Sequence, residues 1–150
     1  SLKLVIFDVD GLLLDTERVW QDVWYDTARD FGIDDWKREL LNVVGRSGQP
    51  VYDYMEELSV DAAPQRIHEV ARQHGVERLE RELTAKPVLE LLNCIKKAGL
   101  PCAVATATSR SLTEERLTRL QLIQYFDYIC CGDEVVERKP SPEAYLKVLA

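Results

Sequence analysis

The sequence has no apolar run approaching the roughly 20 residues that a membrane-spanning helix requires. It also lacks an excess of positive charge: 19 Lys and Arg residues stand against 26 Asp and Glu, a net charge of −7. That balance disfavours nucleic-acid and anionic-membrane partners. Because the amino terminus has the pattern of a strand and not of a signal peptide, we expect a cytoplasmic protein.

Histidine and cysteine, the residues that bind zinc or form disulfides, are also scarce. The two histidines show no second ligand pattern, and none of the four cysteines forms a Cys-x-x-Cys pair. Neither a zinc site nor a disulfide framework is therefore indicated. We predict that the cysteines are buried, reduced thiols; they are Cys94, Cys102, Cys130 and Cys131.

The most informative stretch runs from residue 5 to 17, VIFDVDGLLLDTE. The apolar run 4–7 predicts a strand buried on both faces, with Asp8 and Asp10 at its end and Gly11 permitting a turn. Two carboxylates this close repel each other, and a divalent cation such as Mg²⁺ would offset the repulsion. One carboxylate could attack an electrophile while the other moves a proton. An acidic turn before a helix capped by Asp15 or Thr16 is the alternative.

Hydrophobic periodicity then predicts two regions of different structure. Four consecutive helices are expected between residues 16 and 83, starting near Thr16, Asp34, Gln49 and Pro64. From residue 84 onward helices and strands alternate, which implies right-handed crossovers and a parallel sheet. The helices are predicted from Lys86, Ser111 and Pro142, with Leu91 and Leu112 facing inward, and the strands at 101–106 and 126–131.

The turn after the strand at 101–106 carries Thr106, Ala107, Thr108, Ser109 and Arg110. A hydroxyl and free backbone N–H groups between a strand and a helix can bind a phosphoryl group. Threonines and serines at such positions are also common helix caps, and that is the interpretation given to Thr108 and Ser109.

These features together resemble the haloacid dehalogenase-like (HAD) phosphohydrolases, within them the branch of β-phosphoglucomutase and small sugar-phosphate phosphatases. The stretch Asp8-x-Asp10-Gly11-x-Leu13-x-Asp15-Thr16-Glu17 is similar to the first motif of that family. Thr106 matches the second motif, and Lys139-Pro140-Ser141-Pro142-Glu143 matches the third.

The resemblance implies hydrolysis of a small phosphorylated metabolite through an aspartyl-phosphate. Asp8 would be the nucleophile and Asp10 the acid and base, while Lys139 would neutralise charge around the phosphoryl group. Thr106 and Ala107 would bind the phosphate, and Asp8 with Asp10 would hold Mg²⁺.

The implied architecture is a Rossmann-like α/β core of residues 1–15 and 84–150 with an inserted helical cap domain of residues 16–83. The cap can act as a lid over the ends of the strands. Arg46, in the loop 44–48, could reach the substrate or could be a solvated loop residue.

Two departures from the family pattern matter. The family's acidic fourth motif should follow Lys139 by a couple of dozen residues, but this sequence ends at Ala150. We therefore expect this chain to be an incomplete core that is weakly active or inactive. The open edge of its sheet would then favour self-association. Trp20 stands where β-phosphoglucomutase has His, which favours hydrolysis. There are two alternatives to a phosphatase. One is a β-phosphoglucomutase-like phosphomutase, and the other is a non-catalytic remnant that binds a phosphorylated ligand or a partner.

Overall fold

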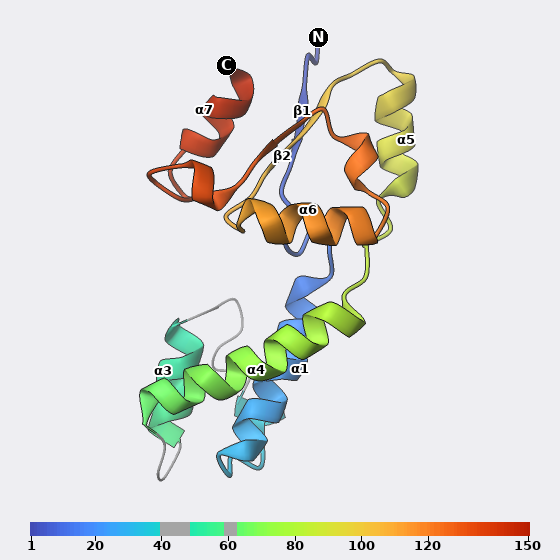
Figure 1. Cartoon of the computed structure of the whole chain (residues 1–150). Helices are drawn as coiled ribbons and strands as arrows, with labels where there is room; N and C mark the ends of the chain where they lie inside the picture. Colours follow the sequence, from blue (N-terminus) through green and yellow to red (C-terminus); the bar gives the residue numbers. More distant parts are fainter. Residues whose placement is uncertain (40–48, 59–62) are drawn as a thin grey trace. The chain divides into compact units, whose positions relative to one another are not determined.

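The computed structural model describes residues 1–39, 49–58 and 63–150. The chain divides into two compact units, one formed by Ser1–Asp15 with Thr84–Ala150 and the other by Thr16–Leu83. Figure 1 shows strands and helices in the first unit and helices in the second. Arg46, which the sequence marked as a candidate substrate contact, lies outside the described residues. None of the described helices is long and apolar enough to cross a membrane.

The first unit contains the parallel sheet that the alternating pattern predicted. Its strands are β1 (Val5–Phe7), β2 (Cys102–Ala105) and β3 (Tyr128–Cys130), in the order β1-β2-β3. All four residues of β2 are buried, whereas Val5 and Ile6 of β1 are only half-buried. The prediction that β1 is buried on both faces was therefore wrong for these two residues, because within the described sheet β1 lies at an edge and pairs with β2 alone.

Helices cover this sheet from both sides. They are α5 (Leu89–Lys97), α6 (Arg110–Arg119) and α7 (Glu143–Leu149), with short 3-10 turns at Ile123–Tyr125 and Gly132–Glu134. Figure 1 shows α7 and α5 on opposite sides of the strands. Ala144 of α7 packs against Ala105 and Cys130, while Phe7 meets Phe126 edge-on, with 5.9 Å between ring centroids.

The start of α5 differs from the predicted start at Lys86. Residues 84–86 instead run alongside residues 13–15: the Asp15 N–H donates to the carbonyl of Thr84, and the Lys86 N–H donates to that of Leu13. These backbone bonds compete with helix formation, so α5 begins only at Leu89.

Three side chains predicted to face inward are exposed. Leu91 and Cys94 of α5 are exposed because Leu92 and Ile95 form the buried face of that helix. Leu112 of α6 is also exposed, since Thr113 and Leu117 take the buried positions. Helical periodicity identifies an apolar stripe, but it does not decide which of two adjacent apolar positions lies at its centre.

The second unit is formed by α1 (Thr16–Asp30), α2 (Trp36–Glu39), α3 (Gln49–Leu58) and α4 (Pro64–Glu82). Its buried core comprises Ala28, Ile33, Trp36, Val51, Met55 and Ile67. Helices α1 and α4 approach closely at Gly75, where an added Cβ would lie 2.8 Å from the ring of Trp20. Arg78 of α4 also bonds Asp26 of α1 at 2.5 Å. The indole of Trp20 thus has a packing role within this unit.

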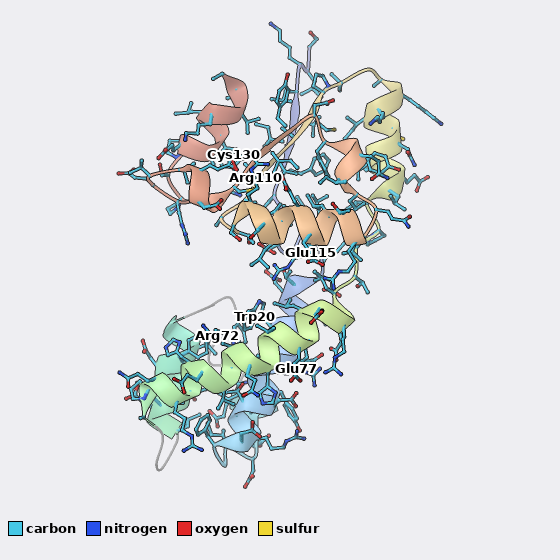
Figure 2. All side chains as sticks on the ribbon, in the orientation of Figure 1. Trp20, Arg72, Glu77, Arg110, Glu115 and Cys130 are labelled. Atoms are coloured by element: carbon cyan, nitrogen blue, oxygen red, sulfur yellow. The ribbon has the colours of Figure 1, made fainter. Side chains whose placement is uncertain are left out.

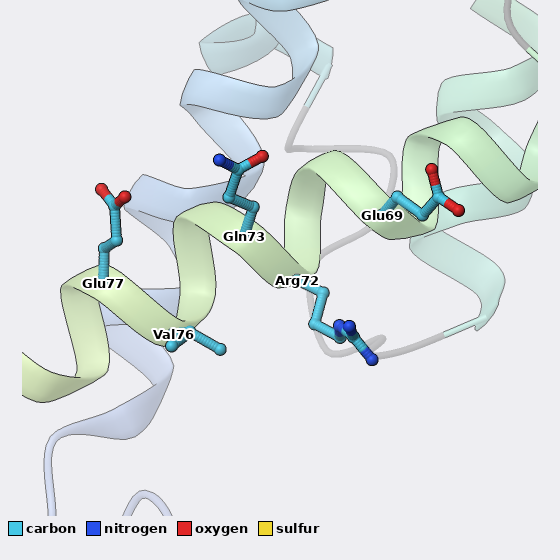
Figure 3. Close-up of a pocket in the computed structure, with 5 residues that line it drawn as sticks. All are labelled: Glu69, Arg72, Gln73, Val76 and Glu77. Atoms are coloured by element: carbon cyan, nitrogen blue, oxygen red, sulfur yellow. The ribbon is translucent and has the colours of Figure 1, made fainter.

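A shallow hollow lies along the outer surface of α4 (Figure 3). Its lining residues are Glu69, Arg72, Gln73, Val76 and Glu77. They come from one helix and carry charges of both signs around a single exposed valine. None of the residues that the sequence identified as candidate catalytic groups takes part in it.

The exposure of the cysteines gives a testable result. In the native protein we expect a thiol reagent to modify Cys94 rapidly, because Cys102, Cys130 and Cys131 are buried. Burial also raises the pKa of the Cys131 thiol, to about 11, which leaves little reactive thiolate at neutral pH. Intact-mass measurement should show one fast adduct, and Cys94→Ser should remove it. Two or more fast adducts in the native protein would contradict the structure.

Candidate active site

Asp8 and Thr106 follow the carboxyl ends of two paired strands, β1 and β2. The Asp8 side chain is 50% exposed, and its Oδ1 accepts a hydrogen bond from the N–H of Val9 at 2.9 Å. Ligand sites in parallel α/β sheets lie beyond these strand ends. Asp8 therefore presents an accessible carboxylate at the edge where such a site is expected.

Asp10 is held by a tight turn that begins at Gly11. Gly11 adopts a φ of +79°, a conformation that side-chain-bearing residues rarely take, and its N–H donates to the carbonyl of Leu14 at 2.9 Å. The half-buried Asp10 side chain accepts a 2.8 Å hydrogen bond on Oδ2 from the hydroxyl of Thr108. The turn thus brings Asp10 to the loop after β2.

Lys139 reaches the same place from a position 131 residues further along the chain. Its Nζ donates to Asp8 Oδ1 at 3.1 Å and to the carbonyl of Ala105 at 2.7 Å, and lies 5.1 Å from the ring centroid of Tyr145. Burial alone would lower the pKa of Lys139, but its interactions with Asp8 and Tyr145 outweigh burial and raise it. The ammonium group is therefore charged at neutral pH and placed beside the Asp8 carboxylate.

The loop after β2 carries Thr106 and Ala107 in different surroundings. Thr106 is buried, 1% exposed, and its Oγ1 accepts the N–H of Thr108 at 3.2 Å. Ala107 is exposed. Ser109 precedes α6 without a side-chain capping bond, and the Thr108 hydroxyl bonds Asp10. Ser109 thus occupies the N-cap position of α6, as predicted, but through its backbone alone, whereas the prediction that Thr108 is a cap residue was wrong.

The loop after β3 packs directly against the loop after β2. The N–H of Gly132 donates to the carbonyl of Thr108 at 2.8 Å, and an added Cβ on Gly132 would lie 1.9 Å from the carbonyl oxygen of Ala107. Only glycine fits this approach of two backbones.

Arg110, labelled in Figure 2, ties the same two loops together. Its guanidinium donates to both carboxylate oxygens of Glu134, at 2.7 and 2.9 Å, and to the carbonyl of Ile129 at 2.6 Å. These bonds, those to Glu134 foremost, raise the pKa of Arg110, and Arg110 in turn lowers that of Glu134. A bidentate pair of this kind is directional as well as strong, so it fixes the start of α6 relative to the end of β3.

Glu143 organises the segment that leads to Lys139. Its carboxylate oxygens accept the N–H groups of Val136 and Glu137 at 2.9 and 2.8 Å. These bonds, that from Glu137 foremost, hold the pKa of Glu143 below its usual value. The glutamate at the end of the third motif thus shapes the approach of Lys139.

This contact predicts a pH effect. A group whose pKa is lowered on folding contributes stability above its unfolded pKa, 4.5 for glutamate, and loses it as the pH falls through the folded value. The difference in melting temperature between the wild type and Glu143→Ala should therefore be largest near neutral pH and shrink below about pH 4. The exposed Glu90→Ala provides the control. A difference that stays constant between neutral and acidic pH would contradict the assignment.

The structure therefore brings Asp8, Asp10 and Lys139 together at the carboxyl ends of the strands, with Thr106 and Ala107 in the adjoining loop. Sequence reasoning missed the contact of Thr108 with Asp10, because the two lie 98 residues apart and a threonine before a helix has the pattern of a cap. It also missed Gly132, which carried no local signal.

The donors near Asp8 fit part of a site for a hard divalent cation. The carboxylate of Asp8 and the oxygens of Asp10 are the kind of ligand that Mg²⁺ prefers. Within the described ranges no cluster of three or more His, Cys, Asp or Glu side chains could complete the site.

The chain is similar to known proteins along nearly its whole length. A family model described as haloacid dehalogenase-like hydrolase matches residues 5–150. A phosphorylated carbohydrates phosphatase of Thermotoga maritima is 34% identical over 99% of this chain and 69% of its own length. The protein CbbY of Rhodobacter capsulatus is 32% identical over 99% of this chain and 71% of its own length. Among solved structures, CbbY of Rhodobacter sphaeroides in complex with phosphate has a TM-score of 0.62 at 27% identity, covering 99% of this chain and 72% of that one. The chain belongs to the haloacid dehalogenase-like hydrolases.

Proposed function

We propose that the protein hydrolyses a small phosphorylated carbohydrate to the free alcohol and inorganic phosphate. The observation that carries this proposal is the exposed Asp8 carboxylate with the Lys139 ammonium 3.1 Å away and Asp10 two residues on. A nucleophile, a fixed positive charge and a second carboxyl group are the parts that phosphoryl transfer requires. The name of the Thermotoga maritima relative, a phosphorylated carbohydrates phosphatase, supports a phosphorylated-sugar substrate.

The reaction divides into two displacements at phosphorus. In the first, an Asp8 carboxylate oxygen bonds to phosphorus, the bond from phosphorus to the ester oxygen breaks, and protonated Asp10 gives its proton to the departing alkoxide. In the second, Asp10 takes a proton from water as that water attacks phosphorus. The bond to Asp8 then breaks and inorganic phosphate leaves. Lys139 offsets negative charge on the phosphoryl oxygens in both steps.

The Asp8 carboxylate and the main-chain carbonyl of Asp10 would hold a divalent cation. Bound Mg²⁺ would supply further charge neutralisation for the phosphoryl oxygens. The backbone of Ala107, an exposed residue in the turn before α6, is the proposed phosphate-binding group of the loop.

Two further features bear on the class of reaction. Trp20, in place of the mutase histidine, packs its indole against Gly75 and so offers no group for proton transfer. Hydrolysis is favoured over phosphate migration for that reason. We assign residues 16–83 the role of a substrate-selecting cap.

The proposal is tested by measuring phosphate release from a panel of sugar phosphates, phosphoglycolate and 4-nitrophenyl phosphate, with and without Mg²⁺. We expect Mg²⁺-dependent release and an enzyme species whose mass is raised by one phosphoryl group and which hydroxylamine discharges, as an acyl phosphate requires. Isomerised sugar phosphate without phosphate release would instead indicate a mutase. Binding of phosphate esters without turnover would indicate a non-catalytic protein.

A further inference from the structure

Thr108 occupies a place in the site that neither its sequence context nor the three motifs assign. It lies three residues beyond β2, yet its hydroxyl donates to Oδ2 of Asp10 at 2.8 Å. Both side chains are half-buried. A hydroxyl that donates to Oδ2 leaves Oδ1 as the oxygen that carries a transferable proton.

The backbone of Thr108 is fixed on both sides. Its N–H donates to the buried Oγ1 of Thr106 at 3.2 Å, and its carbonyl accepts the N–H of Gly132 at 2.8 Å. The first bond ties Thr108 to the end of β2 and the second to the end of β3. Because the side chain is also β-branched and stiff at χ1, the hydroxyl is presented from a rigid support.

We propose that Thr108 is a positioning residue, whose hydroxyl aims the Asp10 carboxyl group at the ester oxygen of the substrate. This role rests on the proposed hydrolysis. An acid must lie within hydrogen-bond reach of the oxygen that it protonates, and a displacement of about 1 Å can cost about 100-fold in rate. Without the bond from Thr108, the Asp10 side chain can rotate out of line while Asp8 and Lys139 stay in place.

The role predicts a dependence on the leaving group. Thr108→Val keeps the β-branched shape and removes the donor. We expect kcat/KM for an alkyl phosphate, whose alkoxide needs a proton, to fall about 10- to 100-fold. For 4-nitrophenyl phosphate, whose phenolate leaves without one, we expect a fall below about 3-fold. Thr108→Ser should restore the alkyl-phosphate reaction, and Ser109→Ala, in the same loop, is the control.

A double mutant separates positioning from structural damage. In an Asp10→Asn background, Thr108→Val should cause no further loss, because the group on which it acts is already gone. An equal fall for both esters, or a further loss in the Asp10→Asn background, would overturn the role of Thr108 alone. A wild type that hydrolyses neither ester would overturn the proposed function and this role together.

Discussion

Asp8→Asn is expected to abolish turnover, with a loss of at least about 1,000-fold in kcat/KM for every substrate of the panel. An amide cannot act as the carboxylate nucleophile, so no acyl phosphate can form. The change is nearly isosteric. Because Asp8 is half-exposed and Lys139 keeps its 2.7 Å bond to the carbonyl of Ala105, the fold should persist.

Three measurements on the Asp8→Asn variant test this prediction. Phosphate release should vanish, the mass increase of one phosphoryl group should be absent, and the melting temperature should stay close to that of the wild type. The exposed Asp34→Asn, in the helical unit, removes one carboxylate elsewhere and should leave all three unchanged. If Asp8→Asn still hydrolysed any substrate of the panel, the nucleophile would have to be another group.

Gly132→Ala should have the next largest effect, on stability and activity together. The new Cβ would lie 1.9 Å from the carbonyl oxygen and 2.6 Å from the carbonyl carbon of Ala107. Both are backbone atoms that cannot rotate away, so the two loops must separate. We expect a loss of about 1–3 kcal/mol or more in the free energy of unfolding, and about a 100-fold fall in kcat/KM as Ala107 and Thr108 shift.

Gly99→Ala is the matched control for this prediction. Gly99 has a φ of +71° with no neighbouring atom within 4 Å of an added Cβ, so alanine there is strained without a clash. It should cost about 1 kcal/mol in unfolding free energy and leave kcat/KM unchanged. Wild-type kinetics in Gly132→Ala would mean that the packing of the two loops does not support the site.

The sequence by itself determined the order of the elements and the place of the first carboxylates. A short apolar run, followed by Asp8, Asp10 and Gly11, predicts a strand that ends in an acidic turn, and the structure has that strand and a positive φ at Gly11. The change from helical repeats to alternating helices and strands near residue 84 likewise predicts a parallel sheet. These features follow from local rules of periodicity and backbone freedom, which neighbouring residues express directly.

Only the tertiary structure decided which side chains meet. The contact of Lys139 with Asp8 spans 131 residues, and apart from the family resemblance nothing in the sequence predicted it. The choice of Thr108 between capping α6 and holding Asp10 was settled by a partner 98 residues away. The need for glycine at 132 arises from a backbone in another loop. Such contacts depend on how strands bring distant loops together, and no local pattern encodes that distance.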